Sequence, residues 1–445
     1  MSGRFFGKQL SSFQIIIAGF LAVILGGTLL LALPFSSAAG CWTSLPDALF
    51  TAVSAVCVTG LVVRDTATYW SVFGQAVILI LIQIGGLGII SITAVIANAS
   101  GKRISLLQRS MLQESLSAHQ MGGVLKLTGF LCKVALATEL LGALLMLPAF
   151  SSAYGSSGIW MSVFHSVSAF CNAGFDIMGE KSGAFSSLTA FAGSPGIVIP
   201  ICLLIISGGI GFLTWDDIAK NKFRLKRYRM QSKVILSATA FLILLPAAIF
   251  FFHDFSDLTL KERLCAAFFH SVTPRTAGFN TVELSSLSSA GRAMTVILML
   301  IGGAPGSTAG GVKVTTLVVL LANMGAVVRR RKNPQLFGRR IEEDTVKCAS
   351  TLLTLYLLLA LGSAFIISVT EGLPFETCLF EAASAIGTVG LSYGITPALG
   401  LLSRGLLIGL MFFGRVGALT LLYAAVSNSK AIETAQYPVG RINVG

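Results

Sequence analysis

Charged residues are scarce in this sequence of 445 amino acids. Asp, Glu, Lys and Arg together make up 11% of it, whereas a soluble domain carries roughly 25%. Apolar residues reach 54%, and long uncharged runs cover residues 13–33 and 74–100. Each run is close to the ~20 residues with which a helix crosses a bilayer. The composition therefore excludes a set of soluble domains and predicts an integral membrane protein with several spans.

Patterns typical of metal, redox or enzymatic chemistry are also missing. The eight cysteines include no C-x-x-C pair, and the four histidines form no local cluster, so cysteine is interpreted as a small apolar residue. No Ser/His, His/Glu or paired-Asp constellation falls at matching depth, which argues against an intramembrane enzyme. No strand, G-x-G-x-x-G and helix follow one another, so this chain is expected to bind no nucleotide itself. The first apolar run lacks a small-residue cleavage site and is predicted to remain as a span.

Basic residues outnumber acidic ones, giving a net charge of +13, and they gather between the apolar runs. Such a bias marks cytoplasmic loops. Three loops and both termini are therefore predicted to lie on the cytoplasmic side of the cell membrane. No basic surface is left over for a nucleic-acid-binding module. These loops and termini hold Lys102, Arg103, Arg109 and Lys126; Lys220, Lys222, Arg224, Lys226, Arg227, Arg229 and Lys233; Arg329, Arg330, Arg331, Lys332, Arg339, Arg340 and Lys347; and Arg4, Lys8, Lys430 and Arg441.

The same succession of features occurs four times along the chain. Each copy has a long apolar run, about a dozen amphipathic residues that end in Gly, and a second apolar run. The central pieces read F-T-A-V-S-A-V-C-V-T-G-L, F-H-S-V-S-A-F-C-N-A-G-F, F-F-H-S-V-T-P-R-T-A-G-F and F-E-A-A-S-A-I-G-T-V-G-L. We therefore predict an all-α integral membrane fold with eight transmembrane helices in four pseudo-repeats of one orientation, around one central pore. The repeats cover residues 1–100, 101–222, 223–335 and 336–445.

The dozen amphipathic residues of each copy are too short to cross the membrane. Twelve helical residues span roughly 18 Å, and the hydrocarbon core is ~30 Å thick. The chain must therefore enter as a half-helix and return as extended backbone, which is tolerated only inside protein or beside a watery cavity. Four such returns can converge on one axis and turn backbone carbonyls toward a dehydrated ion, as T-V-G-Y-G loops do in potassium channels. The predicted filter residues, with K⁺ at their backbone carbonyls, are Val58, Thr59 and Gly60; Asn172, Ala173 and Gly174; Thr276, Ala277 and Gly278; and Thr388, Val389 and Gly390.

Side chains near the filter segments leave alternatives open. Ser54, Ser168, Thr273 and Ser384 come late in the half-helices, where they either hydrogen-bond the filter backbone or cap and pack the helix. No acidic residue lies in the filter segments, which favours a monovalent cation over Ca²⁺ or Mg²⁺. The acidic residues predicted on the outer side either form a vestibule that concentrates cations or are ordinary loop charges. They are Asp47, Asp65, Asp176, Glu180, Asp254, Asp257, Glu262, Glu283, Glu371, Glu376 and Glu381.

The second apolar run of the third copy, residues 291–330, is about twice as long as a crossing requires. Its middle contains several glycines and one proline. Within a helix a glycine costs ~1 kcal/mol and a proline ~3 kcal/mol. We expect a broken span in this copy alone, with a loop that is either a gate beneath the filter or a structural kink.

Arg415 lies mid-span in the last run, where an Arg costs at least ~2.5–3.5 kcal/mol; it is predicted to be an electrostatic barrier or a partner of the loop carbonyls. Lys133 and Glu139 are interpreted as interface or near-surface residues. The predicted gate residues are Gly302, Gly303, Ala304, Pro305, Gly306, Ser307, Thr308, Ala309, Gly310, Gly311 and Arg415.

With these motifs the sequence resembles the Trk/Ktr/HKT superfamily of potassium transporters, and most of all the bacterial Ktr-type membrane (pore) subunit. The resemblance covers essentially the whole chain and rests on the filter segments, above all S-V-S-A-F-C-N-A-G-F and T-x-R-T-A-G-F-N-T, on the broken run and on Arg415. It implies potassium uptake, typically sodium-dependent, by a homodimer with one glycine-lined pore per protomer, surrounded by membrane lipids. It also implies control by a cytosolic RCK-type nucleotide-binding ring. A sodium-conducting or Na⁺/K⁺-symporting member, or a secondary transporter for a small solute, is the alternative.

Overall fold

The computed structural model describes residues 4–5, 8–9, 12–89, 91–92, 112, 124–222 and 224–417. The predicted basic residues Lys102, Arg103, Arg109, Lys430 and Arg441 lie outside the described residues. The described chain is mainly helical and includes two short antiparallel hairpins, β1–β2 and β3–β4. The helices are α1 Ser12–Ala32, α2 Leu45–Val56, α3 Thr66–Tyr69, α4 Val72–Leu87, α7 Val124–Tyr154, α8 Ser157–Phe170, α9 Gly179–Ser182, α10 Pro195–Gly209, α11 Phe212–Asn221, α12 Met230–His253, α13 Leu260–Val272, α14 Ser289–Leu300, α15 Val314–Val328, α16 Glu343–Glu371, α17 Phe375–Gly387 and α18 Leu401–Val416, and the strands are β1 Arg4–Phe5, β2 Lys8–Gln9, β3 Gln335–Leu336 and β4 Arg339–Arg340.

A long helix, a short helix and a third helix follow one another in each of the four predicted copies. The short helices α2, α8, α13 and α17 have 12, 14, 13 and 13 residues, which confirms helical structure at the predicted half-helices. Each carries a phenylalanine nine or ten residues before the terminal glycine of its motif, and these four rings are almost completely inaccessible to solvent. The apolar core therefore lies around the short helices, and its matching rings are Phe50, Phe164, Phe269 and Phe380.

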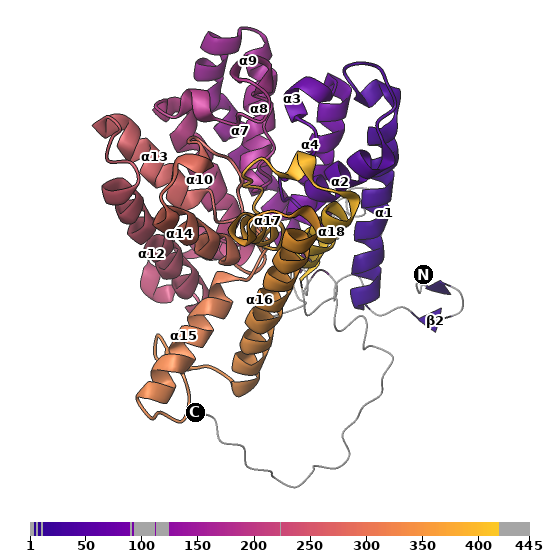
Figure 1. The fold of residues 1–445 in the computed structure, drawn as a ribbon. Helices are drawn as coiled ribbons and strands as arrows, with labels where there is room; N and C mark the ends of the chain where they lie inside the picture. Colours follow the sequence, from indigo (N-terminus) through magenta and orange to yellow (C-terminus); the bar gives the residue numbers. More distant parts are fainter. Residues whose placement is uncertain are drawn as a thin grey trace.

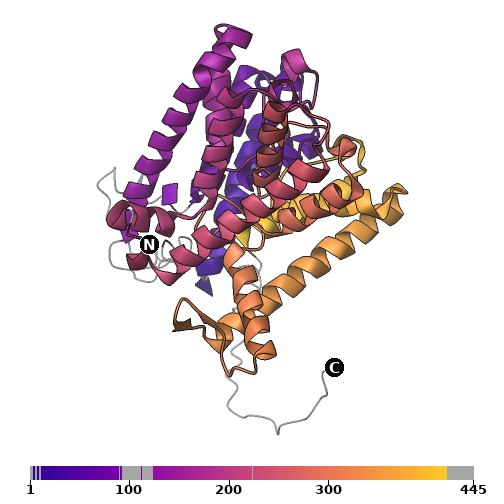
Figure 2. The same ribbon diagram turned by 90° about the vertical axis from the view of Figure 1, so that its left-hand side faces the viewer.

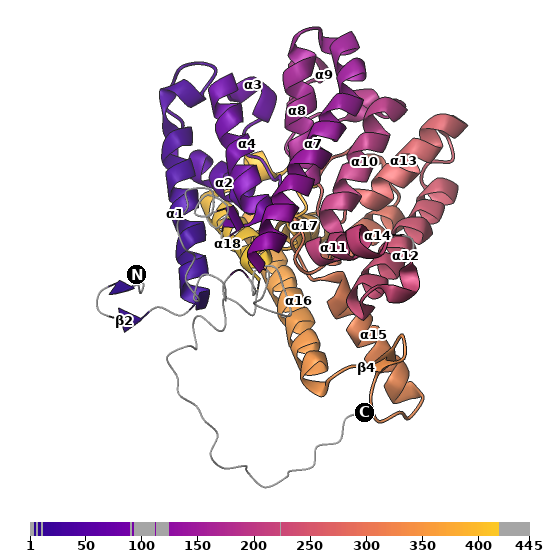
Figure 3. The same ribbon diagram turned by 180° about the vertical axis from the view of Figure 1, so that it is seen from behind.

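The helices form a closed circle. The third helix of each copy contacts the short helix of the next, with α4 against α8, α10 against α13, and α14 against α17. The contact of α18 with α2 completes the circle, so the yellow and indigo ends of the described chain lie side by side (Figures 1 and 3). This arrangement directs the segments that follow the short helices toward one another.

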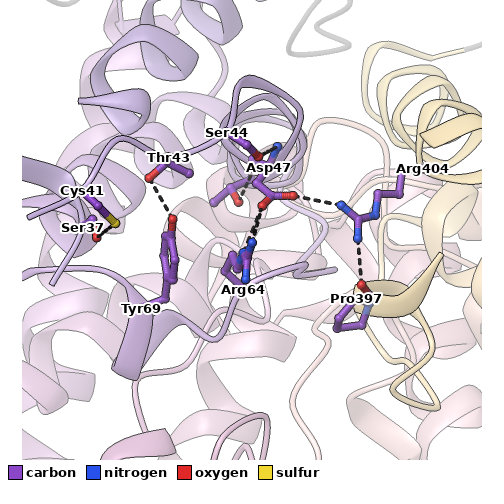
Figure 4. Close-up of polar contacts among 10 residues, drawn as sticks. Ser37, Cys41, Thr43, Ser44, Asp47, Arg64, Tyr69, Pro397 and Arg404 are labelled. Carbon is purple, nitrogen blue, oxygen red and sulfur yellow. Dashed lines mark hydrogen bonds and ion pairs between the residues drawn. The ribbon is translucent and has the colours of Figure 1, made fainter. Parts of the chain in front are cut away.

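An ion-pair bridge connects the last copy to the first (Figure 4). The carboxylate of Asp47, in the first turn of α2, is 2.9 Å from Arg64 and 2.9 Å from Arg404. Arg404 also donates to the carbonyl of Pro397 at 2.7 Å. Because Asp47 is 5% exposed and lies between two guanidinium groups, the bridge fixes α18 against the start of α2.

Within the part of the chain that the structure describes, four helices are long and apolar enough to cross a membrane: Phe13–Ala32, Leu127–Tyr154, Met230–His253 and Glu343–Glu371. The bent pair α10–α11 makes a fifth candidate. The long helices present apolar side chains outward, among them Leu25, Leu144, Phe241 and Phe365. Such large exposed apolar faces suit contact with lipid, so the fold is that of a membrane protein. The count of eight crossings stays a prediction.

The expectation that only the third copy has a broken second span is wrong. Helices α10 and α11 in the second copy meet at 98°, and Gly211 between them has a φ of +85°. In the third copy α14 ends at Leu300 and α15 begins at Val314, so that predicted break is confirmed. The second copy contains Gly208 and Gly209 shortly before Gly211, and closely spaced glycines weaken a helix. That spacing was a usable signal in the sequence.

Helix α15 and the first half of α16 extend away from the other helices (Figures 1 and 2). The hairpin β3–β4 connects them, with Gln335 opposite Arg340 and Leu336 opposite Arg339. Its turn consists of Phe337 and Gly338, both at positive φ, as a tight two-residue hairpin requires. The third predicted basic loop therefore contains an ordered, projecting hairpin.

Candidate functional site

The four predicted filter segments share one backbone conformation. In each, the terminal glycine and the residue two positions before it have positive φ. Three of these preceding residues are β-branched, for which positive φ is a genuine outlier, and such strain is typical of functional sites. Alternation of left-handed and ordinary residues turns successive carbonyls to the same side, as an ion filter requires. The φ values are 55° and 88° for Val58 and Gly60, 57° and 69° for Asn172 and Gly174, 73° and 81° for Thr276 and Gly278, and 51° and 96° for Thr388 and Gly390.

The four glycines meet in a ring. A Cβ atom on Gly60 would lie less than 3.0 Å from the carbonyl oxygen of Ala173, and one on Gly174 less than 3.0 Å from that of Ala277. The same relation holds onward around the circle until the first segment is reached again, so only glycine fits at these places. The structure thus brings all four predicted segments together. The remaining two contacts are Gly278 with the Val389 oxygen and Gly390 with the Thr59 oxygen.

Hydroxyl groups support the filter segments from behind. Ser54 and Ser384 accept hydrogen bonds from the N–H groups of Gly60 and Gly390, at 3.1 and 3.0 Å. The other two hydroxyls donate to the carbonyl that follows the glycine. All four predicted residues therefore bond the backbone of a predicted filter segment or of the residue directly after it, which is the first of the two roles left open by the sequence. The donating pairs are Ser168 with Phe175 at 2.7 Å and Thr273 with Phe279 at 2.5 Å.

Glu381 is a site residue that the sequence-based interpretation misplaced. It follows the buried Phe380 within α17 and has no exposed surface, so it is not an outer loop charge. Its carboxylate accepts hydrogen bonds from the Ser392 hydroxyl at 2.6 Å, the Tyr393 N–H at 3.1 Å and the Thr396 hydroxyl at 2.9 Å. The chain that leaves the fourth filter segment is therefore fastened to its own short helix. The signal in the sequence was its motif position, which Thr51, His165 and His270 occupy in the other copies.

A cavity of about 670 Å³ opens at the end of the filter segments where their glycines lie. All four glycines line it, together with the acidic residues Asp65, Asp176 and Glu283. Burial, with a smaller contribution from the neighbouring Asp65, raises the pKa of Asp176 to about 6, although a hydrogen bond from the Met178 N–H opposes the shift. Three of the acidic residues predicted on the outer side therefore line this cavity, and their role in concentrating cations stays a prediction.

The chain between α14 and α15 lies directly beneath the fourth filter segment. A Cβ atom on Gly310 would come within 3.0 Å of the Thr388 side chain. The loop is attached to the second copy as well, because the Ala304 N–H donates to the Gly209 carbonyl at 2.9 Å and the Thr308 hydroxyl donates to the Phe170 carbonyl at 3.0 Å. The predicted gate residues therefore form one loop that contacts two other parts of the filter region.

Two basic side chains hold this loop. Arg415 donates to the carbonyl of Thr308 in the loop and to the carbonyls of Gly85 and Gly86 in α4, the last at 3.0 Å. The prediction that Arg415 pairs with loop carbonyls is confirmed. Lys313, which sequence reasoning missed although it directly follows the glycine-rich run, donates to the Ala309 carbonyl at 2.7 Å.

The other charges predicted inside a run do not reach the filter. Glu139 is 5% exposed and accepts two contacts from the Gln83 amide, at 3.0 and 3.2 Å, so it lies at the interface of α7 and α4. Lys133 is exposed on α7. Their interpretation as interface or near-surface residues is confirmed.

The family to which this ring and loop belong was identified by comparison with known protein families. The TrkH family, described as cation transport proteins, matches residues 8–434. The chain belongs to this family. Proteins of this family are transporters rather than enzymes, so this chain is a membrane transport protein.

Relatives extend over the whole TrkH-family chain. It is 42% identical to the potassium/sodium uptake protein NtpJ of Enterococcus hirae, over 98% of both chains. It is 37% identical to the Ktr system potassium uptake protein B of Bacillus subtilis, over 97% of this chain and 96% of that one. The crystal structure of the potassium transporter TrkH from Vibrio parahaemolyticus matches with a TM-score of 0.74 at 18% identity, covering 96% of this chain and 87% of that one. This likeness establishes the TrkH fold.

Proposed function

We propose that this chain carries potassium across the cytoplasmic membrane through a filter on the axis of the glycine ring. Eight crossings in four pseudo-repeats, with the predicted boundaries, surround it, and both termini are cytoplasmic. The observation that carries the proposal is the closed ring of Gly60, Gly174, Gly278 and Gly390. Backbone carbonyls arranged in this way replace the hydration shell of a monovalent cation, whereas Ca²⁺ and Mg²⁺ favour carboxylates.

Potassium is the proposed ion because relatives carry that ion in their names. Two are Ktr system potassium uptake proteins, and Thr388, Val389 and Gly390 follow the T-V-G order of potassium-channel filters. The short helices direct their C-terminal ends, each with roughly half a negative charge, toward the filter. Sodium conduction or Na⁺/K⁺ symport is the second candidate, since the Enterococcus relative is a potassium/sodium uptake protein.

The loop 302–311, with Arg415, is proposed as the gate. It lies beneath the filter, and displacing it breaks the hydrogen bonds to Gly209, Phe170 and Arg415. An ordinary hydrogen bond contributes ~0.5–1.5 kcal/mol, and one to a charged group such as Arg somewhat more. Displacing the loop therefore costs a few kcal/mol in total. A regulatory partner can supply a coupling of that size. Relatives named as parts of a Ktr system support such a partner, and we propose a homodimer under a cytosolic nucleotide-binding ring of RCK type.

Purified protein in liposomes tests the conduction proposal. Uptake of K⁺ and of the tracer Rb⁺ is expected to exceed that of Na⁺ by at least about tenfold, with empty liposomes as the control. Absence of cation uptake refutes the pore. Equal K⁺ and Na⁺ uptake assigns the chain to the second candidate.

Deletion of residues 304–307 tests the gate in the same liposomes. The deletion removes the attachment of the loop to α10, and Rb⁺ uptake is expected to rise several-fold. Unchanged uptake by a deletion variant that is inserted and folded identifies the loop as a structural kink.

A further inference from the structure

A cluster of exposed positive charge precedes the span α12. Lys222, Arg224, Lys226 and Arg227 all have exposed side chains, and three of them belong to the stretch around the 3-10 turn Leu225–Arg227. The candidate membrane span Met230–His253 begins only a few residues later. The cluster therefore lies at the level where phospholipid headgroups surround a membrane protein.

The nearby acidic residues leave this cluster without counter-charge. Asp216 pairs with Lys220 at 2.8 Å and with Arg229 at 3.0 Å, and Asp217 is 3.5 Å from Arg229. None of the described ion pairs includes any of the four clustered residues. Four like charges within six residues repel one another, so the cluster attracts an anion from outside the chain.

The backbone that carries the cluster is held in one conformation. The Tyr228 hydroxyl donates to the Lys222 carbonyl at 2.5 Å, and Lys222 itself has a φ of +47°. The buried carboxylate of Asp217 accepts the Arg229 N–H at 3.0 Å and the Ser232 hydroxyl at 2.6 Å. A preformed turn loses less conformational entropy when it binds a ligand than a mobile loop does. This order distinguishes the basic turn from an ordinary solvated loop.

The same turn is connected to the gate loop through α11. Asp217 belongs to α11, and the first residue of that helix, Phe212, donates its N–H to the Gly306 carbonyl at 2.7 Å. A Cβ atom on Gly211 would lie 2.9 Å from the Pro305 carbonyl oxygen. One short helix thus joins the basic turn to the loop beneath the filter.

We propose that Lys222, Arg224, Lys226 and Arg227 bind the phosphate groups of anionic phospholipids, and that the bound headgroup stabilises the contact of α11 with the gate loop. The lipid phosphates neutralise the repulsion within the turn, so the bonds that order it persist longer. Guanidinium and ammonium groups are the natural partners of phosphate oxygens, and basic clusters next to a span bind anionic lipid. The binding step does not depend on which ion the filter conducts.

Hydrogen exchange of the purified chain in detergent tests the proposal. Short-chain phosphatidylglycerol is expected to slow amide exchange in residues 211–217, whereas phosphatidylcholine and inorganic phosphate leave it unchanged. The variant K222Q/R224Q/K226Q/R227Q is expected to lose this protection and to bind the lipid roughly several hundredfold more weakly at low salt, because each charge strengthens binding about fivefold. R224Q/R227Q, a milder change, is expected to lose part of the protection.

The matched control R329Q/R330Q/R331Q/K332Q removes the same number of exposed charges at the end of α15 and is expected to keep full protection. The proposal of a specific anionic-lipid site is overturned if both variants lose the same amount of exchange protection, or if phosphatidylcholine protects as well as phosphatidylglycerol. Protection by inorganic phosphate alone makes it a free-phosphate site and overturns the lipid assignment. If lipid gives the wild-type protein no protection and K222Q/R224Q/K226Q/R227Q transports more weakly in cells, the cluster binds a protein partner. This result also overturns the lipid proposal.

Discussion

Replacement of Gly278 by alanine isolates the steric requirement of the glycine ring. Gly278 has a φ of +81°, and a Cβ atom there would lie less than 3.0 Å from the Val389 carbonyl oxygen. Gly394 has the same φ of +81° but no atom within 4 Å of the added Cβ. Gly394→Ala is therefore a control that shares the backbone strain and lacks the collision.

The expected magnitude follows from this difference. An alanine at positive φ costs about 1–2 kcal/mol at either position. Only Gly278→Ala also pushes the Val389 carbonyl away from its place in the ring, and that oxygen is one of the proposed ion ligands. A contact of a carbonyl with a cation is comparable to a hydrogen bond to a charged group, ~1.5–3 kcal/mol. We therefore expect Rb⁺ uptake to fall about 10- to 150-fold.

The assay is Rb⁺ uptake into liposomes that contain equal amounts of each variant. Gly394→Ala is expected to stay within about twofold of the wild-type protein. Selectivity for K⁺ over Na⁺ is expected to fall in Gly278→Ala together with the rate. Similar uptake by the two variants would show that the ring contact does not control conduction, and the reasoning from the ring would fail.

Three further changes test other parts of the site. Glu381→Ala removes the acceptor of one buried and two partly buried hydrogen bonds, at ~0.5–1.5 kcal/mol each, and is expected to lower the thermal unfolding temperature by several degrees. Asp176 loses its charge below its pKa of about 6, so the apparent affinity for K⁺ is expected to be weaker at about pH 5 than at pH 7.5. Asp176→Asn is expected to abolish this difference in an uptake titration. Arg415→Gln removes the charge beneath the filter and its bond to the loop, and is expected to raise Rb⁺ uptake several-fold.

Each of these has a discriminating control. Glu381→Gln keeps an acceptor oxygen and is expected to retain part of the lost stability; equal unfolding of both variants contradicts the hydrogen-bond account. A pH dependence that persists in Asp176→Asn places the titrating group elsewhere. Arg415→Lys keeps the charge but cannot bridge the loop and α4 as a planar fork does, so intermediate uptake is expected, and wild-type uptake in Arg415→Gln contradicts its role in the barrier.

Much of the architecture could be predicted from local pattern. Run length and charge placement identified the membrane character, because both are set by the thickness of the bilayer and the side of insertion. The dozen-residue half-helices and their terminal glycines were visible, and so was the break around Pro305, because glycine and proline act on the backbone where they occur. The hydroxyls behind the filter were found but not their role, since a serine late in a helix has several local partners.

The sequence by itself thus determined where the apolar runs, short helices and glycine-ended segments lie along the chain. Only the tertiary structure decided which of these segments contact one another. The order of the ring, with Gly60 beside Ala173 and Gly390 beside Thr59, follows from how the helices close the circle. Arg415 reaches α4 across more than three hundred residues of chain, and no local pattern encodes that contact. Glu381 looked like an outer charge because acidic residues usually are; only the packing of α17 against the returning chain makes it the buried acceptor that fastens the filter exit.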